Sequence, residues 1–146
     1  MRRLIVLFAL VLSLAVALPA FAQVPAAVQE AVLSYLTIIA SDYNTISAAA
    51  LKSRLDAGEK VFVLDVREAD EFAAGRVATA VNIPIRTIQQ NLDKLPAKDV
   101  PIAVICRSGI RAAYVTMALR ILGWKDARDM TGGMLEWEKQ GFATVK

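Results

Sequence analysis

The sequence predicts an α/β domain of three layers, in which helices cover both faces of a mainly parallel sheet of about five strands. Two continuous apolar runs, at 61–66 and 101–105, are rich in β-branched residues. Such runs are typical of strands buried on both faces of a parallel sheet. Stretches with helical spacing alternate with these strands, and the length of 146 residues fits one domain with one core.

The other elements follow from local signals in chain order. Glycine, proline and capping residues bound each one. The longest helix should start at Gly109 or Ile110 and place Val115, Leu119 and Leu122 on its apolar side. Further strands are expected at 45–46, 80–83 and 127–130, and further helices at 47–58 with Ser47 as N-cap, at 68–74, at 85–95 and at 132–141.

The first 22 residues have the three parts of a secretory signal peptide. Arg2 and Arg3 precede an apolar block at 4–18, and Ala20-Phe21-Ala22 provides small residues for a signal peptidase. We expect cleavage near Ala22 and export to the periplasm or the extracellular space. A retained membrane anchor is the alternative, although the block is shorter than the roughly 20 residues that span a bilayer.

Residues 23–44 are expected to form a helical extension, and residues 45–146 the α/β domain. From 25 to 40 the apolar side chains recur near helical spacing, which predicts an amphipathic helix that packs onto the domain. These side chains are Val28, Val32, Leu33, Leu36 and Ile39.

Composition excludes several classes of function. Without residues 1–22, which contain two Arg and no acidic residue, the formal net charge of +3 falls to +1, and no basic run suggests nucleic-acid binding. The chain has no His and one Cys. A Cys–His dyad, a Ser-His-Asp triad, an internal disulfide and a His or multi-thiolate metal site are therefore ruled out, and we expect no metal or cofactor.

Cys106 is placed where the chemistry of an α/β domain is expected. It follows the buried strand that ends at Ile105 and precedes the helix that contains Arg111. Ligands of parallel sheets bind beyond the carboxyl ends of the strands. Backbone N–H groups, the helix dipole and the guanidinium groups of Arg107 and Arg111 all favour a thiolate, so a reactive cysteine is favoured over a structural one.

Four motifs in this order resemble the rhodanese family. The sequence CRSGIR at 106–111 is similar to its active-site loop, and LDVREADEF at 64–72, NIP at 82–84 and TGGMLEW at 131–137 are similar to its other motifs. The resemblance covers about 46–142. It departs at 75–80, GRVATA, where the family commonly has GHIPGA, and this puts stability or a surface contact in doubt before catalysis.

The resemblance implies a sulfurtransferase. Cys106 would carry sulfur as a persulfide, from thiosulfate or another sulfane donor to a thiophilic acceptor such as a thiol or cyanide. Arg107 would hold the anionic donor, and Arg111 would tie down the loop. Backbone N–H groups from Arg107 through Ser108, Gly109 and Ile110 to Arg111 would surround the outer sulfur.

Other motif residues are expected to support this loop. Asp65 and Arg67 resemble acid–base candidates, but a brace in which Arg67 pairs with Glu71 is favoured. The Ser108 hydroxyl either donates to the sulfur or caps the helix. Gly132 and Gly133 should allow close approach to the loop and start the last helix, and Trp124, Trp137 and Phe142 should pack in the interior.

Three other functions were weighed. Cysteine-dependent phosphatases of related topology have one more residue between Cys and Arg than this loop has. Phosphatase activity is therefore not expected. An envelope binding or redox-sensing module, with the helix at 25–40 contacting an envelope protein and little turnover of small donors, is the main alternative. An oxidoreductase would need a thiol from a partner, because one Cys cannot form an internal dithiol.

Overall fold

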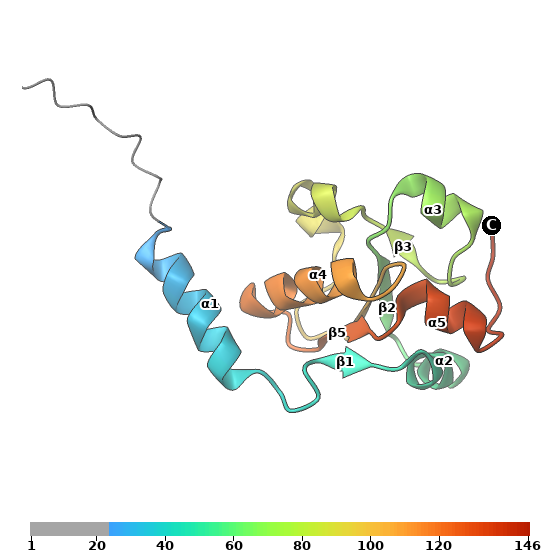
Figure 1. The fold of residues 1–146 in the computed structure, drawn as a ribbon, viewed down its shortest axis with the longest axis horizontal. Helices are drawn as coiled ribbons and strands as arrows, with labels where there is room; N and C mark the ends of the chain where they lie inside the picture. The colour runs from blue at the N-terminus through green and yellow to red at the C-terminus, as the bar shows by residue number, and fades with distance from the viewer. Residues whose placement is uncertain (1–23) are drawn as a thin grey trace, which may run out of the picture.

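The structure is a computed structural model that describes residues 24–146, so the expected signal peptide lies outside the described residues. A sheet of five strands, all parallel, forms its centre in the order β1-β5-β4-β2-β3. Figure 1 shows how the helices surround this sheet. The strands are β1 (Thr45–Ile46), β2 (Phe62–Asp65), β3 (Val81–Asn82), β4 (Ile102–Ile105) and β5 (Ala127–Met130).

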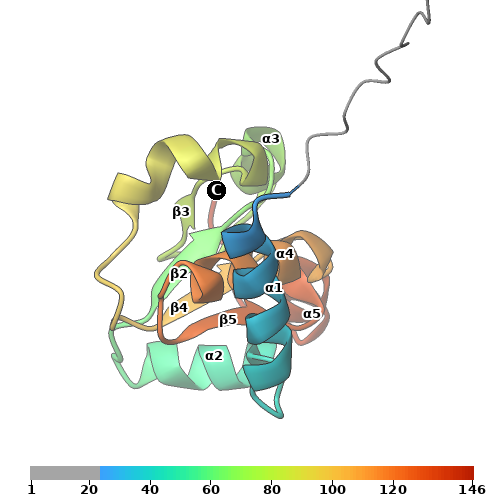
Figure 2. The same cartoon turned by 90° about the vertical axis from the view of Figure 1, so that its left-hand side faces the viewer.

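Helices cover both faces of the sheet, which confirms the predicted three layers (Figure 2). One face packs against α4 and the 3-10 segment η1, and the other packs against α2 and α5. The helical elements are α1 (Ala26–Ile38), α2 (Ala48–Asp56), α3 (Ala69–Ala74), η1 (Ile85–Lys94), α4 (Ile110–Ile121) and α5 (Gly133–Lys139).

Most predicted elements lie within a few residues of their expected places. Ser47 caps α2, since its hydroxyl accepts the N–H of Ala50. The exception in type is 85–95, where the structure has 3-10 geometry interrupted by non-helical dihedral angles at Asn91. The apolar side of that segment still packs on the core through Ile85, Ile88 and Leu92.

Two helices bury less than the sequence predicted. Leu122, expected on the apolar side of α4, is 48% exposed because it comes after the last helical turn. The expected apolar stripe of α1 is buried only in part, since Val32 and Ile39 are half-buried while Val28, Leu33 and Leu36 are exposed. The buried residue of the helix is Tyr35. Tyr35 anchors α1 to the domain, and its hydroxyl accepts a hydrogen bond from the Asn44 side chain at 2.9 Å.

The sheet order brings the active-site motifs together. Strands β2 and β4 are neighbours and pair in parallel from Phe62↔Ile102 to Asp65↔Ile105. Their carboxyl ends therefore lie side by side, and the loops that follow them meet at one edge of the sheet. None of the helices within 24–146 is long and apolar enough to span a membrane.

One buried carboxyl group in β5, that of Asp129, has an oxygen atom without a partner among residues 24–146. Asp129 is 9% exposed, and its Oδ1 atom makes no hydrogen bond to these residues. Burial disfavours the charged form of a carboxyl group. Desolvation accordingly raises the pKa of Asp129 from 3.8 to about 6. At neutral pH the folded chain therefore holds an uncompensated charge in this position.

We predict that Asp129→Asn stabilises the protein at high pH. Because the pKa of Asp129 is higher in the folded state, protonation of this carboxyl group favours folding. This contribution to stability is fully present below the ordinary pKa of 3.8 and is lost as the pH rises through about 6. Urea unfolding at pH 8 should show a gain of about 2 kcal/mol for the variant, shrinking towards zero near pH 4.

Asp42→Asn provides a control of opposite sign. The hydrogen bond from Arg128 lowers the pKa of Asp42, so the ionised form contributes stability above its ordinary pKa of 3.8. This variant should lose stability at pH 8. A loss of stability for Asp129→Asn at pH 8 would contradict the cost assigned to its charge.

Candidate active site

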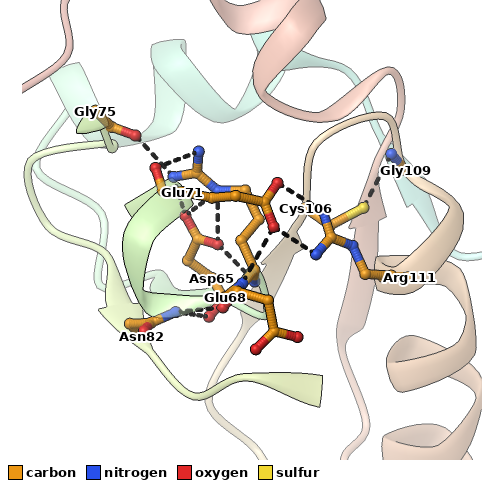
Figure 3. Close-up of polar contacts among 9 residues, drawn as sticks. Asp65, Glu68, Glu71, Gly75, Asn82, Cys106, Gly109 and Arg111 are labelled. Atoms are coloured by element: carbon orange, nitrogen blue, oxygen red, sulfur yellow. Dashed lines mark hydrogen bonds and ion pairs between the residues drawn. The ribbon is translucent and has the colours of Figure 1, made fainter. Parts of the chain in front are cut away.

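Cys106 lies at the end of β4, beneath the loop that leads into α4 (Figure 3). Its side chain is 1% exposed, and its Sγ accepts the backbone N–H of Gly109 at 3.2 Å. Gly109 has a φ of +97°, a left-handed conformation that a residue with a Cβ adopts only with strain. This conformation turns the chain into α4 while its N–H points back at the sulfur. Cys106 is thus buried but held by a backbone donor.

Arg111 connects the loop to α3. Its Nη1 and Nη2 donate to the two carboxylate oxygens of Glu71 at 2.7 and 2.8 Å (Figure 3). Such a bidentate pair fixes the plane of the guanidinium group. The Glu71 hydrogen bonds raise the pKa of Arg111, with a smaller contribution from Cys106. Arg111 therefore presents a positive charge held in place near Cys106.

The Glu71 carboxylate accepts hydrogen bonds both from Arg111 and from the backbone at the start of α3. The hydrogen bond from Arg111 is the main cause that lowers its pKa from 4.5 to about 2. Its Oε2 also accepts the backbone N–H of Glu68 at 3.2 Å, as half of a capping box at the start of α3. Helix start and active-site arginine are therefore held by the same carboxylate, which is ionised at neutral pH.

The expected pairing of Arg67 with the Glu71 carboxylate is wrong. Arg67 instead pairs with Asp65, two residues earlier, at 2.6 Å. The guanidinium group also donates to the carbonyl oxygens of Glu71 and Gly75. Both members of the pair are buried, so a short-range partner satisfies Arg67 while Glu71 remains free for Arg111.

This buried pair acts as a brace for the loop after β2, as the sequence suggested in outline. Asn82 of β3 adds to the brace, because its side-chain amide donates to the carbonyl oxygens of Asp65 and Arg67 at 3.0 and 2.9 Å. Asn82 belongs to the NIP motif, but the sequence does not indicate this role. Its position in a motif was the available signal, and the distant carbonyl partners became visible only in the fold.

The start of α5 packs directly on the active-site loop. The N–H groups of Met134 and Leu135 donate to the carbonyl oxygens of Cys106 and Arg107 at 2.8 and 3.0 Å. A Cβ on Gly133 would contact the Cys106 carbonyl oxygen and lie 2.6 Å from the Arg107 carbonyl carbon. The predicted close approach is thus present, with Gly133 as the residue that permits it.

The remaining loop side chains point outward. Ser108 is exposed, and Gly109, without a side-chain hydrogen bond, is the N-cap of α4, so the capping alternative for Ser108 is wrong. Ile110 is 67% exposed. Arg107 is exposed and forms no ion pair with any residue of the described range 24–146, which leaves its guanidinium group available.

A groove of about 310 Å³ lies beside the loop. Arg107 contributes to one wall, and residues of the β2–α3 segment and of α5 form the others. The groove adjoins the loop without including the Cys106 sulfur in its lining. The lining residues are Arg67, Asp70, Glu71, Ala74, Gly75, Arg107, Met134, Leu135 and Glu138.

The unusual segment 75–80 is well packed. Arg76 lies over the Phe72 ring at 4.8 Å and pairs through its backbone with Val145. Val77 is 3% exposed. These contacts hold the segment without the His, Pro and second Gly that the family commonly has. Among the residues described, no cluster of three or more His, Cys, Asp or Glu side chains is arranged to hold a metal.

Comparison with known proteins identifies the family. The family model for the Rhodanese-like domain matches residues 47–140. The chain belongs to this family. The match includes the loop at 106–111 and the strands from β2 to β5 with their helices, and α1 lies outside the matched region.

Three relatives illustrate the similarity. The Bacillus subtilis protein YtwF is 40% identical over 97 residues, covering 66% of this chain and 92% of that protein. A human thiosulfate:glutathione sulfurtransferase is 31% identical over 106 residues, covering 64% and 91%. The crystal structure of a rhodanese-related protein from Thermoplasma volcanium has a TM-score of 0.63 and 35% identity, covering 69% and 96%.

Replacing Arg111 should make Cys106 less reactive. In Arg111→Met the charge that favours the thiolate is removed, so alkylation of Cys106 by iodoacetamide at pH 7 should slow about tenfold. Arg120→Met, in the last turn of the same helix, is the control and should leave the rate unchanged. An unchanged rate in Arg111→Met would show that its charge does not act on the sulfur.

Replacing Gly133 should destabilise the fold. In Gly133→Ala the new Cβ collides with backbone atoms of the loop, and we expect a loss of about 3 kcal/mol in urea unfolding. Gly141→Ala is the matched control, since Gly141 also has a positive φ, +73°, but open space around its Cβ position. It should cost about 1 kcal/mol, and equal losses for both variants would contradict the packing role.

Proposed function

We propose that this protein is a sulfurtransferase that carries sulfur as a persulfide on Cys106. The observation that carries the proposal is the surroundings of the sulfur. Cys106 Sγ accepts the Gly109 N–H, and Arg111 is held near it by Glu71. A backbone dipole and a fixed cation favour the thiolate without any histidine. The names of relatives, among them the human thiosulfate:glutathione sulfurtransferase, support the same chemistry.

The reaction proceeds in two displacements. The Cys106 thiolate attacks the outer sulfur of thiosulfate, a new S–S bond forms, and the bond to the departing sulfite breaks. An acceptor thiolate then attacks the outer sulfur of the Cys106 persulfide, and Cys106 leaves as a thiolate. Each step moves one sulfur atom and one bonding pair, so no external oxidant or reductant is required.

Arg107 is suited to hold the donor. Its exposed guanidinium group forms no ion pair with another residue of 24–146 and lines the groove next to the loop. A planar guanidinium group can donate two parallel hydrogen bonds to an oxyanion such as the sulfonate end of thiosulfate. The other arginine that lines the groove, Arg67, is paired with Asp65, which leaves Arg107 as the group available to an anion.

The buried position of Cys106 also fits a persulfide. Cys106 is 1% exposed, and a persulfide would add a second sulfur atom beyond this buried Sγ as the atom that an acceptor attacks. We also propose an oxidising compartment for this protein, because the first 22 residues have the pattern of a secretory signal.

Incubation with thiosulfate followed by mass spectrometry tests the proposal. The intact protein should gain the mass of one sulfur atom on Cys106, and the gain should disappear after addition of cyanide, with thiocyanate released. Cys106→Ser should show neither change. An unmodified Cys106 with no thiocyanate would refute the proposal and favour the binding or redox-sensing module.

A further inference from the structure

A second pocket lies between α1 and the rhodanese-like domain and shares no lining residue with the groove. Its volume is about 270 Å³, close to the lower end of the roughly 300–1,000 Å³ typical of small-molecule sites. Figure 1 shows α1 standing beside α4, on the side of the domain away from α3 and α5. The walls come from α1, the 41–45 turn, α4 and β5, through Tyr35, Leu36, Ile39, Tyr43, Thr45, Ala113, Thr116, Met117 and Asp129.

Two buried polar groups in these walls lack partners. Thr116 is 3% exposed and Asp129 is 9% exposed. Thr116 Oγ1 and Asp129 Oδ1 make no hydrogen bond to any residue of the described chain. Buried polar atoms are nearly always paired, because an unpaired one costs about 1–3 kcal/mol. Two such atoms around one pocket indicate a ligand that supplies hydrogen-bond donors.

The remaining walls of the pocket indicate the chemistry of the rest of the ligand. Most of the wall is apolar, with Leu36 from α1, Ile39 directly after it, and Ala113 and Met117 from α4. A ligand that fills it must therefore carry an apolar group. Several water molecules fit in such a volume, but they bring no counter-charge to a carboxylate.

The charge of Asp129 indicates which kind of hydrogen-bond donor the ligand carries. With its pKa raised to about 6 by burial, Asp129 is ionised at neutral pH, and no basic side chain lies among the residues that line the pocket. An ammonium group carries three donors and the complementary charge. A neutral alcohol would pair with the oxygen atoms but leave the charge buried, which is the more costly state.

We propose that this pocket binds a small organic ammonium ion with an apolar tail, its charged end on Asp129 and Thr116 and its tail between α1 and α4. The site does not depend on sulfur transfer at Cys106. It does adjoin the active-site loop, because a Cβ on Gly109 would lie 3.6 Å from Asp129 Oδ2. The extra helix α1 thus completes a site that the family domain alone lacks.

Hexylamine is a suitable probe, with 1-hexanol and hexanoate as matched ligands of equal length. At pH 7.5, hexylamine should cause saturable shifts in the amide NMR signals of Ala113, Thr116 and Met117. Hexanol and hexanoate should bind about tenfold more weakly or not at all. Equal binding of hexanol would overturn the proposal in favour of a merely apolar pocket, as would the absence of saturable shifts with hexylamine.

Variants separate the site from general charge attraction. Asp129→Asn should weaken hexylamine binding about tenfold or more, and Thr116→Val about threefold. Glu30→Gln removes an exposed acid from α1 and should leave the affinity unchanged. Cys106→Ser should also bind normally, which keeps this test distinct from that of sulfur transfer. Unchanged affinity in Asp129→Asn would refute the site.

Lowering the pH provides a further test. Asp129 is the group near the pocket that titrates between pH 5 and 7.5, so binding should weaken as the pH falls through about 6. Besides Asp129, the lining contains the phenol groups of Tyr35 and Tyr43 and no other carboxylate. Arg128 and Asp42 form an ion pair with each other, and α4 contributes no ionisable residue to the lining. Binding independent of pH would contradict the role of Asp129.

Discussion

The parallel pairing of β2 with β4 is the constraint on which the site depends. These strands run side by side from Phe62↔Ile102 to Asp65↔Ile105, and both are largely buried between helical layers. Burial on both faces permits only one register with the core filled, because a slip by one residue would exchange the two faces. The register therefore aligns the carboxyl ends of β2 and β4, so that the loop after Asp65 and the loop after Ile105 begin side by side.

From this junction the charges of the site are arranged in two separate pairs. Arg67 is satisfied inside its own loop by Asp65, while Glu71 reaches across to Arg111 on α4. The first pair is buried and braces the backbone; the second is partly exposed and holds a cation near Cys106. This division lets one segment of sequence support both the shape of the loop and its electrostatics.

The sequence predicted the order of the elements well, because buried strands have continuous runs of β-branched residues. The structure places Cys106 directly after one of these strands, as expected. The sequence predicted the buried faces of the helices less well. The apolar residues of α1 suggested a buried stripe, yet the helix contacts the domain chiefly through Tyr35, because it lies at the end of the domain rather than across a sheet face. Local spacing cannot reveal what a helix has to pack against.

The sequence alone determined the α/β class, a single Cys at the end of a buried strand in a chain without histidine, and a glycine pair near the last helix, since these depend on residue type and local spacing. Only the tertiary structure decided which acid pairs with which arginine, because Asp65 and Glu71 are both near Arg67 in sequence and only the fold brings Arg111 to Glu71. It also decided that Asp129 and Thr116 stay unpaired beside a pocket under α1. A missing partner depends on every segment that packs nearby, and no single stretch of sequence contains that information.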